Sequence, residues 1–208
     1  MQILLQGMGV GVALAAPIGP INIEIIRRGL RGGFLNGWLV GLGAMTADTI
    51  FCALVVSGAT PLADNPVVRI PLYLLGAAVL LFLGVSGLIA AVRGAETTGS
   101  PPSGRRSFVA GFMMAVGNPM GIVYWLSIGA ALIAGAIEQA GREAGPVLVA
   151  GVFSGILLWV TALSGLTRAG REFVSPRIMR VISAAGAMVL VGFGLFFLWS
   201  GLRGLAAL

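Results

Sequence analysis

The sequence predicts an all-α, polytopic membrane protein with six transmembrane helices arranged as two inverted three-helix repeats. The chain is 58% hydrophobic and only 10% charged, whereas soluble domains carry about 25% charged residues. Its apolar runs are long and rich in Leu, Ala, Val and Gly, unlike the short alternating segments of a membrane β-barrel. Because a helical span needs ~20 apolar residues, about six spans fit into 208 residues. We expect one membrane domain over residues 1–208.

The predicted spans cover residues 3–24, 34–57, 67–92, 108–137, 145–166 and 178–202. The first span is not read as a cleaved signal peptide, because no positive charge precedes its apolar run. Most arginines lie in the loops after the first, third and fifth spans. The positive-inside rule places these loops in the cytoplasm and both termini on the periplasmic side. We therefore read the arginines as topology signals and assign them no substrate role.

A polar stretch separates the chain into two halves. Residues 93–106 read RGAETTGSPPSGRR, which is typical of a flexible linker. We predict a first repeat over residues 1–92, a cytoplasmic linker over 93–107 and a second repeat over 108–208. With three spans in each half, the second half crosses the membrane in the opposite sense. The second helices also look alike, since residues 43–58 and 150–165 both end in Ser-Gly.

The first span contains the sequence PIGP at residues 17–20. Pro17 and Pro20 lack a backbone N–H, and Gly19 permits unusual dihedrals, so we expect the helix to kink or break here. Irregular backbone at membrane depth is tolerated only where it is buried in protein or lines a wet cavity. Glu24 follows near the predicted cytoplasmic end, where an interfacial charge, an ion pair with the neighbouring arginines and a transport role all remain open.

The fourth span contains a second irregularity, at Asn118 and Pro119, flanked by Gly117 and Gly121. It lies ~15 Å from the start of the span, near the middle of a hydrocarbon core ~30 Å thick. The first helix of each half is therefore predicted to be interrupted. Interrupted spans in corresponding positions indicate the substrate site of a transporter. The alternative is that Pro and Gly are simply frequent in membrane helices.

Asp48 is the isolated charge of the second span and lies ~21 Å from the start of that span. A carboxylate at this depth costs several kcal/mol unless it faces a cavity, finds a partner or takes up a proton. We therefore predict a proton-coupling role for Asp48, with Thr46 and Thr49 as hydrogen-bonding neighbours. The alternative is a structural aspartate that is tied to a kinked helix by hydrogen bonds.

The composition disfavours several other classes of protein. The net charge of +6 comes from arginine alone and reports topology, so we expect no nucleic-acid partner. The chain has no histidine and a single cysteine, Cys52, which we interpret as a small core residue. We therefore expect no cofactor and no resident metal, and we disfavour an intramembrane enzyme.

Two alternative functions and one question of assembly remain open for such a chain. A divalent metal ion exporter is disfavoured because two carboxylates in the membrane are a poor cage for a hard cation. A structural subunit predicts that Asp48→Asn has no effect. The glycines at positions 37, 41 and 43 are typical of a close helix-packing face, which permits a homodimer without requiring one.

Several segments of the chain together resemble the LysE family of amino-acid exporters. They are residues 17–48, 73–88, 108–119 and 180–198. The first motif of the family maps onto Pro17, Gly19 and Pro20, its acidic position onto Asp48, and its second motif onto Asn118 and Pro119. The resemblance implies a multi-pass protein of the bacterial inner membrane that exports amino acids or related small zwitterionic solutes, driven by the proton motive force.

The chain departs from the family pattern in two places. Met120 stands where many members have lysine after Asn-Pro. Of the Ala-Gln-Asn continuation that lysine and arginine exporters carry after the first motif, this chain retains only Asn22. The resemblance therefore does not single out a basic amino acid as the substrate.

The resemblance and the two breaks suggest a mechanism. Helix ends near Gly19 and Asn118 would present N–H groups to a substrate carboxylate, while Asp48 and the Asn22 and Asn118 amides would hold its ammonium group. Protonation of Asp48 from outside would favour release, and one half would rock against the other. Tyr124 and Trp125 follow the second break, where they either size the pocket or pack in the ordinary way.

Overall fold

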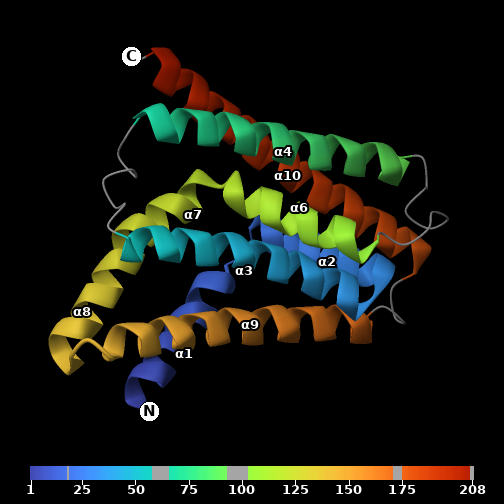
Figure 1. The fold of residues 1–208 in the computed structure, drawn as a ribbon. Coiled ribbons are helices and arrows are strands. Elements are labelled where there is room, and N and C mark those ends of the chain that lie inside the picture. The colour runs from blue at the N-terminus through green and yellow to red at the C-terminus, as the bar shows by residue number, and fades with distance from the viewer. Residues whose placement is uncertain (18, 58–65, 93–102, 171–174, 207–208) are drawn as a thin grey trace.

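The computed structural model describes residues 1–17, 19–57, 66–92, 103–170 and 175–206, and every element of this part of the chain is a helix (Figure 1). The first half contains α1 (Gln2–Ala15), α2 (Pro20–Gly32), α3 (Phe34–Val56) and α4 (Pro66–Val92). The second half contains α6 (Gly104–Val116), α7 (Pro119–Tyr124), the π-helix η2 (Trp125–Gly129), α8 (Ala130–Ala140), α9 (Ala144–Gly170) and α10 (Pro176–Ala206). The all-α prediction is confirmed for the described residues.

Four helices of the described chain are long and apolar enough to cross a membrane, namely α3, α4, α9 and α10. Helices α1 and α2 pass the same test together and are bent by 81° at the PIGP sequence. By length and composition this gives up to five spans. The predicted fourth span is divided among α6, α7, η2 and α8. Both predicted interruptions are therefore present, while the six-span count stays a prediction.

The predicted linker overlaps the start of α6. That helix begins at Gly104, and the Ser103 hydroxyl caps it by accepting a hydrogen bond of 3.4 Å from the backbone N–H of Arg106. Residues 93–102 lie outside the described part of the chain. The second half thus starts a turn earlier than the predicted span at residue 108.

Glycines set the closest helix contacts in the bundle. A Cβ at Gly7 or Gly11 of α1 would overlap backbone oxygens of α9, so side chains larger than hydrogen are excluded there. Gly43 of α3 lies against the backbone of α6 in the same way, and Gly111 of α6 lies against the backbone of α3. Small residues permit such close approach of membrane helices. The predicted packing role of the glycine-rich face of α3 is confirmed, and its partner is in the same chain.

The most extensive helix pairs are α4 with α10, α1 with α9 and α3 with α6. Each pair joins a helix of the first half to a helix of the second half. The main core lies where α2, α3, α7, η2 and α9 meet, and it includes Ile25, Val40 and Phe51. Cys52 belongs to this core, as predicted, with 6% of its surface exposed. In contrast, Phe82 of α4 is 73% exposed, as expected for a side chain that faces lipid.

Candidate functional site

A cavity of about 460 Å³ lies between the two halves, within the range of about 300–1,000 Å³ that is usual for small-molecule sites. Residues of α1, α2, α3 and α4 contribute to its lining from the first half, and residues of α6, α7, η2, α9 and α10 contribute from the second. Six of the seven predicted site residues line it: Pro17, Gly19, Pro20, Asn22, Asp48 and Asn118. The cavity therefore brings together predicted site residues that are about a hundred positions apart in the sequence.

Both interruptions restart with proline as the first helical residue, since Pro20 begins α2 and Pro119 begins α7. Proline suits this position because its fixed φ is helical and its missing N–H would be unpaired there in any case. The side chain of Pro119, the seventh predicted site residue, lies outside the described part of the structure. Gly19, the N-cap residue of α2, makes no side-chain capping bond, and Gly19 and Pro20 both line the cavity, which places the N-terminal end of that helix at the cavity.

Asn22 bridges the first interruption by hydrogen bonds from α2 to the end of α1. Its amide nitrogen donates to the carbonyl oxygens of Ala15 at 2.7 Å and Pro17 at 2.8 Å. These carbonyls lie at the end of α1, where the broken helix has no further N–H groups for them. The amide oxygen of Asn22 accepts a bond of 3.3 Å from the indole N–H of Trp159. Asn22 thus has a positioning role that the sequence interpretation did not include.

Asp48 lies on α3 and faces the second interruption. Its Oδ1 accepts a hydrogen bond of 3.0 Å from the indole N–H of Trp125, the first residue of the π-helix η2. A π-helix is rare and occurs frequently at functional sites, because the extra residue in the turn redirects side chains. Thr46 and Thr49 were predicted to be hydrogen-bonding neighbours of Asp48, but they are not. Their hydroxyls donate instead to carbonyls of their own helix, each at 2.9 Å.

Two tryptophans of the second half therefore donate to polar residues of the first half across the cavity, Trp125 to Asp48 and Trp159 to Asn22. The Trp125 ring is also stacked on Phe153 of α9, with 5.6 Å between centroids. Packing thus fixes the indole that contacts the carboxylate. Tyr124 lines the cavity as well, which agrees with the pocket-forming alternative for Tyr124 and Trp125.

The sequence interpretation missed the remaining aromatic wall. Trp159 of α9 and Phe193, Phe196 and Phe197 of α10 line the cavity. Phe197 is 3% exposed and packs edge to face with Tyr73 of α4 at 5.7 Å between centroids. No sequence signal separates these rings from lipid-facing ones, because both lie in apolar spans.

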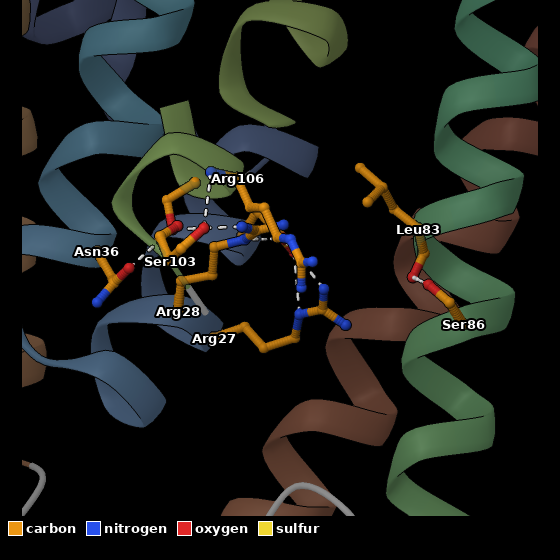
Figure 2. Close-up of polar contacts among 9 residues, drawn as sticks. Arg27, Arg28, Asn36, Leu83, Ser86, Ser103 and Arg106 are labelled. Atoms are coloured by element: carbon orange, nitrogen blue, oxygen red, sulfur yellow. Dashed lines mark hydrogen bonds and ion pairs between the residues drawn. The ribbon is translucent and has the colours of Figure 1, made fainter. Parts of the chain in front are cut away.

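A second polar cluster lies further along α2, beyond the end that enters the cavity. Glu24 is fully buried, and its carboxylate pairs with Arg27 at 2.9 Å and Arg28 at 2.6 Å. The guanidinium of Arg28 also donates to Ser107 of α6 at 3.2 Å, and the Ser107 hydroxyl donates to Asn36 of α3 at 2.9 Å. Figure 2 follows these contacts from Arg27 and Arg28 to Asn36.

This cluster corrects the placement of two arginines. Arg27 and Arg28 were expected in a loop after the first span, but α2 continues to Gly32 and buries them, with exposures of 7% and 9%. The physical reason is Glu24, whose buried carboxylate compensates their charge. Of the alternatives for Glu24, the local ion pair is confirmed, and it extends to Ser107 in the second half.

Comparison with known proteins supplies the family. Residues 12–201 match the family described as LysE type translocator. The chain belongs to this family. The match covers more than half of the chain and includes both interruptions, Asp48 and the whole cavity. The family resemblance that the sequence motifs carried is thus confirmed, and the chain is a multi-pass membrane translocator.

Three relatives of this LysE type translocator span nearly its full length. It is 29% identical to the Bacillus subtilis protein named "Putative amino acid efflux protein YcgF", over 98% of both chains. It is 35% identical to "Chemotactic transduction protein ChpE" of Pseudomonas aeruginosa, over 92% of this chain and 95% of the relative. It is 26% identical to "Lysine exporter LysE" of Corynebacterium efficiens, over 92% and 96%. No solved structure gives a significant match.

Proposed function

We propose that this LysE type translocator exports amino acids or related small zwitterionic solutes across the bacterial inner membrane, in exchange for protons. One observation carries the proposal. Six of the seven residues predicted from the sequence, Asp48 among them, line a single cavity between the halves, although the two motifs lie about a hundred positions apart. Two relatives are named for amino acid efflux or lysine export, which agrees with a solute of this class.

The two ends of a zwitterion find different groups in this cavity. The substrate ammonium meets Asp48, the acidic residue of the described lining, and competes there with the indole N–H of Trp125. The carboxylate meets the N-terminal end of α2, where the uncapped backbone carries the positive end of the helix dipole. Asn118, in the backbone break before α7, contributes its amide from the other half.

Proton coupling follows from the same carboxylate. Ionised Asp48 attracts an ammonium group, whereas protonated Asp48 has no charge to offer it. A proton that arrives from the periplasmic side therefore weakens substrate binding and promotes release on that side. The return of the empty carrier delivers the proton to the cytoplasm, and export is driven by the proton gradient.

Alternating access requires two units that move relative to each other, and we propose residues 1–92 and 108–208 as inverted three-span repeats. In this relation the first interrupted segment, which starts with α1, corresponds to the second, which starts with α6, and α3 corresponds to α9. Exchange of the two halves then replaces the contact between α1 and α9 by the contact between α6 and α3. Both are major contacts. The α4 and α10 pair is converted into itself. The contact pattern thus supports a twofold relation between the halves.

The proposed topology places both termini in the periplasm. Figure 1 supports an even number of crossings, because the start of α1 and the end of α10 lie at the same end of the bundle. The end of α2, a helix that carries Arg27, Arg28 and Arg31, and the end of α9, which precedes Arg171 and Arg177, lie at the opposite end. That end is the proposed cytoplasmic side.

The proposal is tested with purified protein in liposomes loaded with labelled amino acids. Efflux is followed with and without an imposed pH gradient, for the native chain and for Asp48→Asn. We expect one class of amino acid to leave the native liposomes faster when the outside is acidic, and this acceleration to disappear in the variant. Glu138→Gln is the matched control, because Glu138 is an exposed carboxylate on α8.

If the folded native protein released none of the amino acids, the export proposal would be overturned, and other solutes or a structural role would be favoured instead. Gradient-driven efflux that survives in Asp48→Asn would leave the export proposal standing but would remove Asp48 as the coupling residue.

A further inference from the structure

The lining of the cavity is dominated by apolar and aromatic side chains. Among the described residues it contains one carboxylate, Asp48, and two amides, Asn22 and Asn118, and no arginine. The remaining large side chains are aliphatic or aromatic, among them Leu80 and Ile156. A site of this composition has one charged position and otherwise recognises its ligand by apolar contact.

We infer that the solute is an amino acid with a large apolar or aromatic side chain. The inference rests on the proposed export function and names the substrate class of the same cavity. Its basis is the match between one ammonium group and one carboxylate, and between an apolar side chain and an apolar wall. The wall is preformed, since Trp125 is stacked on Phe153 and Phe197 packs against Tyr73.

A basic amino acid fits this lining poorly. Its side chain brings a second positive charge into a cavity that offers one carboxylate among its described residues. A buried charge without a partner is strongly unfavourable. An acidic amino acid fits no better, because its second carboxylate finds no cationic side chain in the same lining. Both classes therefore bind more weakly than a neutral side chain.

A small polar amino acid is also disfavoured, for a different reason. It satisfies Asp48 but leaves the walls around Phe197, Leu80 and Ile156 in contact with water. Each methylene that fills a hydrophobic pocket contributes enough binding for a rate difference of about tenfold or more. The difference between threonine and phenylalanine spans several such groups. Aromatic rings also offer their faces to the ammonium group, which adds cation–π attraction.

The test is a ranking of efflux rates from liposomes that contain the native protein. Equal concentrations of labelled phenylalanine, leucine, threonine, lysine and aspartate are compared under the same pH gradient. We expect phenylalanine and leucine to leave about tenfold or more faster than the other three. Efflux of lysine or threonine without phenylalanine or leucine would overturn the substrate class and leave the export proposal intact. Efflux of none of the five would instead overturn the export proposal.

A further arm distinguishes an amino acid from an apolar amine. Phenethylamine carries the ring and ammonium of phenylalanine without the carboxylate. Because its neutral form crosses bilayers unaided, its binding is compared with that of phenylalanine on the purified protein in detergent, and we expect binding to be about tenfold or more weaker, since phenethylamine makes no contact with the end of α2. Equal affinities would overturn the assignment to amino acids.

A substitution that narrows the cavity tests the same inference from the protein side. Gly121 lines the cavity, and a Cβ there meets only the Asn118 amide, at 3.6 Å, which is an ordinary contact. We expect Gly121→Val to slow phenylalanine efflux about tenfold more than leucine efflux. The matched control is Gly165→Val on α9, where an added Cβ meets nothing within 4 Å. Equal slowing of both solutes in Gly121→Val would overturn the placement of the side chain in this cavity.

Discussion

The buried ion cluster on α2 makes a quantitative prediction about stability. Glu24 is fully buried, and Arg27 and Arg28 are 7% and 9% exposed. The substitution Glu24→Gln leaves two nearly buried guanidinium groups without their counter-charge. Removal of one partner from a buried ion pair costs about 3–5 kcal/mol. For a chain of this size, each kcal/mol lowers the Tm by about 2–4 °C, so Glu24→Gln melts about 6–20 °C below the native chain.

The assay is thermal unfolding in detergent, followed by circular dichroism and by loss of the monodisperse peak in size-exclusion chromatography. Arg27→Gln keeps the 2.6 Å pair between Glu24 and Arg28, so its Tm loss is smaller. Glu138→Gln removes an exposed carboxylate from α8 and changes stability by less than about 0.5 kcal/mol. If Glu24→Gln melted at the same temperature as the Glu138→Gln control, the buried carboxylate would not stabilise the cluster.

Three other substitutions test the packing and the hydrogen bonds of the cavity. Gly11→Val forces a side chain into the backbone of α9, so we expect a loss of about 1–3 kcal/mol, whereas Gly9→Val on the same helix meets nothing within 4 Å and leaves the Tm unchanged; equal melting of the two would contradict the close α1 and α9 contact. Asn22→Ala leaves two carbonyls of the first interruption without a donor, which costs about 1–3 kcal/mol and lowers efflux, while Gln139→Ala on the exposed end of α8 does neither. Trp125→Phe retains a ring to stack on Phe153 but removes the N–H that contacts Asp48, so efflux falls about tenfold with little change in Tm; Trp38→Phe, which loses an exposed bond to Thr161, transports normally.

The sequence allowed the interruptions and the isolated carboxylate to be predicted because these residues are costly in a bilayer. Pro17, Pro20 and Asp48 each oppose the apolar helical background, so their presence calls for a cavity. The glycines of α3 were likewise recognisable as a packing face. These features depend on local chemistry, which a linear sequence displays directly.

Other parts of the site depend on which face of each helix turns inward. In a membrane protein the inward face of a helix does not differ in polarity from the outward face, since lipid-facing and core-facing residues are both apolar. Phe82 and Phe197 are indistinguishable by type, yet they are 73% and 3% exposed. The aromatic wall of α10 and the role of Trp159 could not be predicted for this reason.

The Glu24 cluster shows a different limit. The sequence places a glutamate shortly before two arginines at the end of a span. This pattern is equally compatible with a solvated interfacial group and with a buried ion cluster. What decides the matter is Ser107, which contacts Arg28 from 79 positions away in the sequence. Only the fold brings these two residues together.

We propose that one cavity, through Asp48, exchanges a solute for a proton. The most direct test measures proton movement itself, with a pH-sensitive dye inside liposomes that contain the native protein and phenylalanine. We predict that phenylalanine efflux acidifies the interior, and that Asp48→Asn abolishes this acidification while Glu138→Gln preserves it. Efflux of phenylalanine by the native protein with no change in internal pH would contradict the exchange of solute for protons.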